Sequence, residues 1–381
     1  MVPRILLLAD ISSSHTEKWA LALAQNGYQV GIFSLNKPNN PWYVSNKNIH
    51  VLYNGTLANT SRFFFKKPGY LFAMPKLISC IRSFVPDIVH AHYASSYGLL
   101  GALCRFKPFV ISAWGSDVYQ FPRTSFIHKA ILKFNLRAAD RILSTSYVMK
   151  GELWNYTSKE IDVIPFGVDT EIFRPEIIRY KERNTLYIGA IKAMEEIYGI
   201  ETLIDAVELV KRSLPEIVLK VLLVGSGHRS AYYKKLVSAK NLDSIFVFTG
   251  KISFSHISEY HNLLDILVNV STVNESFGVS VVEGMACEKP VIVSNVPGLK
   301  EVIADCGIIV EKQNPGELAK AIIQLIRYPR LRNSLGKAAR KHVLENYDFK
   351  NCLRRMISVY DSLLPLEERS VLPVKVNMEK I

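Results

Sequence analysis

Two glutamates eight residues apart, Glu275 and Glu283, give this sequence its clearest capacity for chemistry. On a helix, eight residues advance about 12 Å and turn about 80° beyond two full turns, so both carboxylates can face one ligand at different heights. Between them, the backbone N–H groups of Ser276, Phe277 and Gly278 at a helix start would favour a phosphate. This order of groups fits a sugar, a diphosphate and a ribose. Two ordinary glutamates on a solvated helix would have the same spacing.

Alternating strands and helices are expected to position these groups. The first apolar run, residues 4–9, is followed by a polar loop and a helix that begins with the capping box Ser14 and Glu17 and ends near Gly27. One face of a later helix carries Ile200, Leu203, Ile204, Val207 and Val210. Further apolar runs lie at residues 28–33, 87–90, 109–112, 141–144, 185–188, 219–224, 245–248, 266–268, 291–293 and 308–310. This alternation predicts doubly wound parallel sheets, whose ligands bind at the carboxyl ends of the strands.

The length of 381 residues exceeds that of one ordinary domain of about 100–200 residues. The alternation stops at residues 164–175, where two prolines and a glycine indicate a linker, and then restarts. We therefore expect two α/β domains, residues 1–175 and 176–345, that face each other across a cleft. A helix with one apolar side is expected at residues 346–364, followed by a loosely ordered tail at residues 365–381.

Composition excludes several classes of protein. Hydrophobic residues make up 49% of the chain and charged residues 21%, which fits a folded globular protein and excludes a disordered or collagen-like one. The five cysteines form no CxxC pair, so we expect neither a zinc cluster nor a disulfide framework, and a reducing cytosol is the simpler setting. The apolar run at residues 5–9 is too short for a signal peptide, and no run of about eighteen uncharged apolar residues occurs. We therefore expect a cytoplasmic protein that does not span a membrane.

The segment from Glu275 to Pro290 resembles the E-x7-E signature of glycosyltransferase family 4. Three more segments resemble motifs of that family in the same order along the chain, at residues 162–175, 221–227 and 296–301. The resemblance implies the GT-B fold, with two Rossmann-like domains and a C-terminal helix that crosses back to the N-terminal domain. It also implies retaining transfer from a nucleotide sugar. In that reaction Glu275 would contact the transferred sugar, Glu283 the ribose hydroxyls and Gly225 the nucleotide.

The donor side departs from the family at its usual diphosphate-binding cations. Most relatives carry an Arg just after the glycine of the first strand of the C-terminal domain and a Lys before a following glycine. Here these positions are Gly189-Ala190 and Tyr198-Gly199. Lys192 is the nearest replacement, because the charge of a leaving group needs a cation or dipole close by. The resemblance therefore implies Gly189 and Lys192 at the nucleotide sugar, and the alternative is that Lys192 is a solvated lysine.

The resemblance also implies an acceptor side in the N-terminal domain. Trp114 stands where a His is frequent in relatives, within a Trp-Gly-Ser-Asp form similar to that of relatives believed active. His90 and His92 end a strand and His15 lies in the first strand–helix loop, although a single histidine is more often structural than catalytic. The acceptor-side residues that we expect are Ser13, His15, His92, Trp114 and Asp117.

The implied mechanism uses neither a metal ion nor a cofactor. No Asp-x-Asp sequence occurs in the chain, and GT-B enzymes generally do not need the divalent ion that such a motif holds. The pair His90 and His92 is not taken as a metal site. Retention in this family is thought to proceed by front-face attack, in which the departing phosphate oxygen takes the acceptor proton. Glu275 would orient the sugar and stabilise its developing charge, and Lys192 would stabilise the phosphate, so these two are the expected catalytic residues.

The net charge indicates which class of acceptor to expect. The formal charge of +13 favours anionic partners, and residues 1–170 carry +9 of it, with 18 Lys and Arg against nine Asp and Glu. Within them, the segment from Arg62 to Phe72 combines aromatic residues with cations, as surfaces that bind anionic headgroups do. The alternative is a partly buried loop with solvated lysines. We expect a lipid-linked glycan acceptor at the inner face of the cytoplasmic membrane and rank nucleic acid well below it, because no nucleic-acid-binding motif occurs.

These features predict a hexosyltransferase that moves a hexose or N-acetylhexosamine from a nucleotide diphosphate sugar, most commonly a UDP-sugar, to a glycan. The product would belong to a cell-surface polysaccharide, a lipopolysaccharide or a glycoconjugate. Two alternatives stay open. A non-hydrolysing nucleotide-sugar 2-epimerase shares the two-domain architecture and would form an epimer without an acceptor. A catalytically silent nucleotide-sugar-binding protein would account for Trp114 and the missing cations, and would bind nucleotide without turnover.

Overall fold

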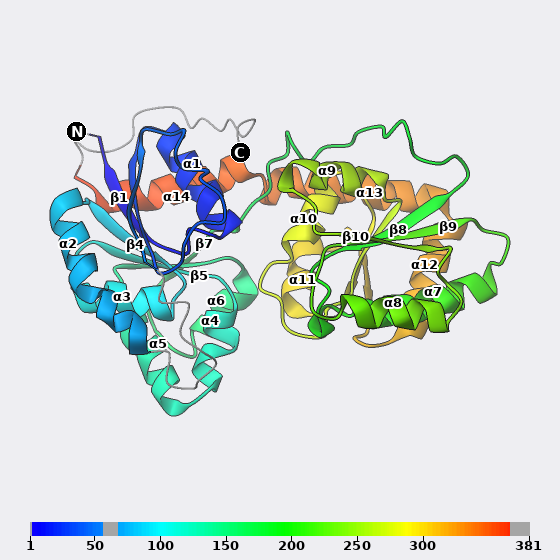
Figure 1. Cartoon of the computed structure of the whole chain (residues 1–381), viewed down its shortest axis with the longest axis horizontal. Coiled ribbons are helices and arrows are strands. Elements are labelled where there is room, and N and C mark those ends of the chain that lie inside the picture. The colour runs from blue at the N-terminus through cyan, green and yellow to red at the C-terminus, as the bar shows by residue number, and fades with distance from the viewer. Residues whose placement is uncertain (1, 56–67, 366–381) are drawn as a thin grey trace. The chain divides into compact units, whose positions relative to one another are not determined.

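The computed structural model describes residues 2–55 and 68–365 of the chain. The chain divides into two compact units, residues 1–166 with 350–381, and residues 167–349. Each unit is built on one parallel β-sheet that helices cover on both faces (Figure 1). The predicted α/β class with two Rossmann-like sheets is therefore confirmed.

The first unit has the sheet order β3-β2-β1-β4-β5-β6-β7 among its described residues, with every neighbouring pair parallel. The strands are β1 (Arg4–Leu8), β2 (Gln29–Ser34), β3 (Ile49–Asn54), β4 (Ile88–His92), β5 (Phe109–Ala113), β6 (Arg141–Ser144) and β7 (Ile161–Val163). The helices are α1 (Ser14–Gln25), α2 (Met74–Phe84), α3 (Ser96–Cys104), α4 (Ser116–Tyr119), α5 (Phe126–Ala138), α6 (Tyr147–Leu153) and α14 (Phe349–Leu363), with 3-10 turns η1 (Pro68–Ala73) and η2 (Phe121–Arg123). Because the strand order reverses between β1 and β4, a topological switch point lies at their carboxyl ends.

The last helix belongs to the first unit, although it is far from it in sequence. The apolar side of α14 is buried, through Leu353, Met356, Ile357 and Tyr360. The Tyr360 ring packs edge-on against Tyr28, with ring centroids 6.1 Å apart. Burial of these side chains against the sheet, rather than the helical propensity of the segment, holds the helix in place.

The second unit has the sheet order β10-β9-β8-β11-β12-β13 among its described residues, again all parallel. The strands are β8 (Leu186–Ile191), β9 (Leu219–Val224), β10 (Phe246–Gly250), β11 (Ile266–Asn269), β12 (Val291–Ser294) and β13 (Ile308–Val310). The helices are α7 (Ile200–Ser213), α8 (Ser230–Ala239), α9 (Phe254–Leu263), α10 (Val279–Ala286), α11 (Pro297–Ile303), α12 (Pro315–Arg327) and α13 (Pro329–Asn346), with a 3-10 turn η3 (Glu196–Tyr198).

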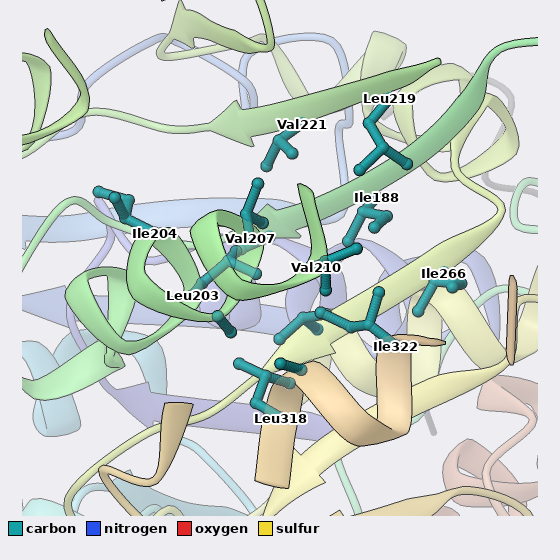
Figure 2. Close-up of a cluster of buried hydrophobic side chains, with 14 of the residues drawn as sticks. Ile188, Leu203, Ile204, Val207, Val210, Leu219, Val221, Ile266, Leu318 and Ile322 are labelled. Carbon is teal, nitrogen blue, oxygen red and sulfur yellow. The ribbon is translucent and has the colours of Figure 1, made fainter. Parts of the chain in front are cut away.

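Figure 2 shows the core on one face of this second sheet. The predicted apolar face of α7 is fully buried there, with Leu203, Ile204 and Val207 each at 0% exposure. These side chains pack with residues of β8, β9, β11 and α12, among them Ile188, Leu219, Val221, Ile266, Leu318 and Ile322. Each fully buried Leu, Ile or Val stabilises the folded state by about 1.5–3 kcal/mol. This core therefore holds in place the strands whose ends carry the candidate site.

Two expectations from the sequence lie mainly outside the described residues. The aromatic and cationic segment from Arg62 to Phe72 falls mostly on residues 56–67, and the tail expected beyond residue 365 falls on residues 366–381. Within residues 2–55 and 68–365, no helix has the length and apolar character needed to cross a bilayer.

Candidate functional site

The candidate residues of the second unit lie at the switch point of its sheet. β8 lies at the centre of the sheet, next to β9 on one side and β11 on the other, so the strand order reverses there. Lys192 directly follows β8, Gly225 follows β9, and Glu275 lies in the loop after β11. Since all three strands are parallel, these residues share the carboxyl edge at which such sheets bind ligands.

Glu275 and Lys192 form an ion pair at this edge. The Lys192 Nζ lies 2.7 Å from Glu275 Oε2, and the two side chains are only 14% and 12% exposed. The Lys192 Nζ also lies 4.7 Å from the centre of the Tyr198 ring, a cation–π contact. Ser271 donates a short hydrogen bond to Glu275 Oε1. Both carboxylate oxygens of Glu275 are thus held, one by a cation and one by a hydroxyl.

The helix expected to carry both glutamates begins later than the spacing suggested. α10 begins at Val279, so Glu283 lies on it while Glu275 lies in the preceding loop. Gly278, at the N-cap, has φ +69°, a left-handed conformation that interrupts a right-handed helix. Glu275 is therefore positioned by its loop contacts and not by helical periodicity.

The turn at the start of α11 supports the backbone of Glu275. A Cβ built on Gly298 would lie 2.0 Å from the Glu275 carbonyl oxygen, far inside a normal contact. Only glycine allows this approach, so the segment at residues 296–301 contributes a backbone support rather than a side chain.

Glu283 is almost buried on α10 and has one side-chain partner among the described residues. The Nε2 of His261, on α9, lies 3.3 Å from Glu283 Oε2. The His261 side chain is 0% exposed and that of Glu283 is 11% exposed. The second glutamate of the motif is therefore held from inside the protein.

The other residues expected at the nucleotide sugar include Gly225, Gly189 and Phe277, and each has a structural role in or next to the sheet. A Cβ on Gly225 would lie 2.0 Å from the Lys192 carbonyl oxygen, so the β9 loop passes tightly over the end of β8. Gly189 is inside β8, where a Cβ would lie 2.7 Å from the Leu222 carbonyl oxygen. Sheet packing alone accounts for that glycine. The Phe277 side chain is buried and its ring packs edge-on against Tyr347, so this ring belongs to the core.

In the first unit, His15, Trp114 and Phe166 form an aromatic cluster beside the switch point. Ser13 caps α1 by accepting a hydrogen bond from the His15 N–H at 3.3 Å, one residue before the expected cap Ser14. The His15 ring stacks on Phe166, with centroids 4.0 Å apart, and meets Trp114 edge-on at 5.8 Å. Burial, with smaller effects of Lys18 and His92, lowers the pKa of His15 to about 3.

The two histidines of β4 point to the same face, with ring centroids 4.7 Å apart. His90 uses both ring nitrogens inside the core, Nδ1 with the Tyr360 hydroxyl at 2.6 Å and Nε2 with the Ser112 hydroxyl at 2.8 Å. It therefore ties α14 to the sheet. The His92 ring packs against Trp114, and burial lowers the pKa of His92 to about 3. A histidine that is neutral and so weakly basic is a poor general base near pH 7.

Asp117 organises the loop that carries Trp114. Its carboxylate is fully buried and accepts hydrogen bonds from the backbone N–H groups of Gly115 and Ala94 at 2.7 Å and of Trp114 at 3.1 Å. Burial raises the pKa of Asp117, while these N–H bonds oppose the rise. The Asp of the Trp-Gly-Ser-Asp form thus fixes the position of Trp114.

A small pocket opens in the first unit next to this loop. Its lining combines aromatic rings with hydroxyl groups, from Trp19, Trp114, Phe166, Ser112, Ser144 and Thr145. The Thr145 hydroxyl is buried and has no hydrogen-bond partner among the described residues. The described ranges hold no cluster of three or more His, Cys, Asp or Glu side chains that could bind a metal ion.

Sequence reasoning missed several residues that hold the candidate side chains. Ser271 and His261 bind the two glutamates, and Tyr198 and Phe166 pack on Lys192 and His15. By the family resemblance, Tyr198 stands where a Lys is expected, and that departure was the available signal, because an aromatic ring can hold a neighbouring cation. No sequence signal marks His261, which lies 22 residues from its partner.

Comparisons with known proteins match both units. Residues 4–146 match the family described as "Glycosyl transferase 4-like", and residues 168–342 match "Glycosyl transferases group 1". An uncharacterized glycosyltransferase of Methanocaldococcus jannaschii is 30% identical over 285 residues, which cover 73% of this chain and 76% of that protein. D-inositol 3-phosphate glycosyltransferase of Arthrobacter sp. is 27% identical over 360 residues, which cover 85% of this chain and 83% of that protein.

Among solved structures, Anabaena HepE in complex with UDP superposes with a TM-score of 0.77 at 18% identity. The superposition covers 95% of this chain and 100% of that one. At this identity the likeness shows a shared fold, which extends over both units.

Proposed function

The chain belongs to the glycosyl transferases group 1 family, of the family 4 type with the GT-B fold, and on this premise we propose that it transfers a hexose or N-acetylhexosamine from a nucleotide diphosphate sugar. Membership in this family favours transfer over the 2-epimerase alternative. UDP is the first nucleotide to test, since Anabaena HepE binds UDP.

The observation that carries the proposal is the ion pair of Lys192 with Glu275 at the carboxyl edge of the sheet. The two side chains bring one cation and one anion to a nearly buried place, where charges act more strongly than in water. A diphosphate would attract the Lys192 ammonium and the positive end of α10, whose first residue, Val279, follows shortly after Glu275 in the chain. Glu275 would then face the sugar, and Glu283 the ribose hydroxyls.

The proposed chemistry is front-face transfer with retention. The bond between the anomeric carbon and the phosphate oxygen breaks first, which gives the sugar an oxocarbenium-like charge that Glu275 stabilises. The acceptor oxygen bonds to the same face of the anomeric carbon, and its proton passes to the departing phosphate oxygen. The low pKa values of His15 and His92, each about 3, support this route, because neither histidine would take that proton effectively near pH 7.

A panel of UDP-, GDP- and ADP-sugars tests the proposal. A donor that binds the native state raises the melting temperature, and the same donor should release its nucleoside diphosphate when acceptor is added. NMR of the product should show the anomeric configuration of the donor. An epimer formed without acceptor would favour the epimerase, and binding without release on any acceptor would favour a silent binding protein.

For the acceptor, we propose a lipid-linked glycan at an anionic membrane, and the exposed face of α5 supports it. Phe126 is 82% exposed, and Ile127 and Phe134 are also exposed on this helix. The cations of α5 lie on the same outward side, at Lys129, Lys133 and Arg137. The helix contains no acidic residue. Apolar side chains next to cations suit an anionic lipid surface, which takes up the first and attracts the second.

Vesicle flotation tests this surface. The protein should bind vesicles with anionic lipid at low salt and bind purely zwitterionic vesicles much less. The pair of changes Phe126→Ser and Phe134→Ser should reduce binding, whereas Ile177→Ser, at a 94% exposed position of the second unit, should not. Equal binding by all three proteins would contradict a role for α5.

A second acceptor class is favoured by one relative. The Arthrobacter protein is named for transfer to D-inositol 3-phosphate, and the +9 charge of residues 1–170 also suits a phosphorylated polyol. Transfer to inositol phosphate or another sugar phosphate, with no stimulation by vesicles, would favour this class. Transfer only to a lipid-linked glycan would favour the first.

A further inference from the structure

The buried histidine His261 contacts Glu283 of α10, and the proposed reaction does not use this contact. His261 lies on α9, its side chain is 0% exposed, and its Nε2 is 3.3 Å from Glu283 Oε2. Its Nδ1 is buried and has no hydrogen-bond partner among the described residues. A Cβ built on Gly284, the neighbour of Glu283, would lie 3.2 Å from that nitrogen. The His261 ring also packs edge-on against Phe173, with centroids 5.8 Å apart.

These contacts decide which nitrogen carries the proton. A carboxylate oxygen only accepts hydrogen bonds, so the bond to Glu283 requires a proton on Nε2. A proton on Nδ1 would be a buried donor without an acceptor, which is costly. The neutral ring with the proton on Nε2 satisfies both conditions. His261 therefore donates from within the protein to one fixed oxygen of Glu283.

The bond leaves the second oxygen of Glu283 for a ligand. Among the described residues, His261 is the side chain that hydrogen-bonds to this carboxylate, and the Glu283 side chain keeps 11% exposure. A carboxylate held at one oxygen has lost most of its rotational freedom before the ligand arrives, so less is lost on binding.

We propose that His261 is a positioning residue that orients Glu283 for the two ribose hydroxyls of the nucleotide. The inference rests on the proposed function, because it takes the ribose contact of Glu283 as given. It adds that selection of a ribonucleotide depends on a residue that does not touch the ligand. Loss of His261 should weaken the binding of a ribonucleotide and leave the binding of a nucleotide without ribose hydroxyls nearly unchanged.

Binding of a diphosphate with and without its ribose hydroxyls provides the test. Calorimetry gives Kd for UDP and for its 2′,3′-dideoxy form, or for the GDP pair if the native protein prefers GDP. The measured quantity is the ratio of the two Kd values, which a general loss of stability would not change. We expect a ratio of about tenfold or more in the native protein, typical of a hydrogen bond to a charged group.

Two amide variants of His261 differ in reach and serve as a matched pair. The side-chain nitrogen of Gln can occupy the position of Nε2, whereas that of Asn reaches only the position of Nδ1. His261→Gln should therefore keep most of the ratio, and His261→Asn should bring it close to one. His256→Gln is the control, because His256 lies on the same helix, is exposed and bonds only to Ser253 and Ser255 in the described part of the chain.

Glu283→Gln separates the inference from the proposed function. If this variant keeps the native ratio, Glu283 does not bind the ribose, and both the assignment and the inference fail. If it loses the ratio while His261→Asn keeps it, the ribose contact stands and the role of His261 is wrong. If His261→Asn does not fold, the position of the ring proton of His261 in the native protein tests the proposal instead. Long-range ¹H–¹⁵N NMR should show the proton on Nε2, and a proton on Nδ1 would overturn the proposal.

Discussion

Replacement of Gly298 by alanine should disable the protein without unfolding it. Gly298 is the second residue of α11, and a Cβ there would lie 2.0 Å from the Glu275 carbonyl oxygen and 3.1 Å from the Ser276 carbonyl carbon. The neighbours are backbone atoms, which cannot rotate away as the end of a side chain can. Either the turn of α11 or the backbone of Glu275 has to move.

The size of the movement follows from the contact. Ordinary van der Waals contact begins at 3.4 Å, so the separation has to grow by about 1.4 Å. A displacement of about 1 Å at a reacting group costs about 10²-fold in rate, because the transition state needs exact alignment of the charges. Overpacking should also lower the free energy of unfolding by about 1–3 kcal/mol.

Gly316→Ala is the matched control for this experiment. Gly316 follows Pro315 at the start of α12, just as Gly298 follows Pro297, but its Cβ would meet only Asn314 Oδ1, at 3.5 Å. Release of nucleoside diphosphate and the melting temperature are measured for both variants. A Gly298→Ala protein with the turnover of the control would refute the claim that this turn supports Glu275.

Three further outcomes follow from the same contacts. Lys192→Met should lower the free energy of unfolding by about 3 kcal/mol, because the nearly buried Glu275 carboxylate loses its cation. In denaturant unfolding, adding Glu275→Gln to this variant should restore most of the lost stability. A double variant as unstable as the single one would contradict a structural role for the ion pair. Burial lowers the pKa of His92 from 6.5 to about 3, so below pH 6.5 the unfolded chain binds a proton at this residue that the native protein does not. His92 should therefore contribute about 2 kcal/mol to the loss of stability from pH 7 to pH 5. His92→Leu should remove that part of the loss in unfolding curves at the two pH values. EDTA should leave turnover unchanged, because Lys192 and the start of α10 supply the charge for the diphosphate. A rate that is lost on chelation and restored by Mg²⁺ would contradict transfer without a metal ion.

The sequence predicted the central strands well and missed two strands at the edges of the first sheet. The central strands are buried on both faces, so each is a continuous apolar run, as at residues 219–224. β3 (Ile49–Asn54) is mostly half-buried with polar residues between apolar ones, and β7 (Ile161–Val163) is only three residues long. An edge strand needs less apolar surface, and its pattern is correspondingly weak.

The site was predictable where residue type limits the chemistry and unpredictable where position depends on tertiary contacts. The motif glutamates and Lys192 were identified, but the pairing of Lys192 with Glu275 spans 83 residues and arises only when β8 and β11 lie side by side. His90 was a candidate because it ends a strand, and yet both its nitrogens are bonded inside the core. Strand position indicates an edge of the sheet but not whether a side chain there is already satisfied.

Turnover of Glu275→Gln shows whether the Glu275 carboxylate acts on the transferred sugar. The variant keeps the size of the side chain and removes the charge that should stabilise the transferred sugar. We expect the affinity for the nucleoside diphosphate to stay within a few fold, and nucleoside diphosphate release with acceptor to fall by at least about 10²-fold. A Glu275→Gln enzyme that keeps most of the native rate would contradict the account.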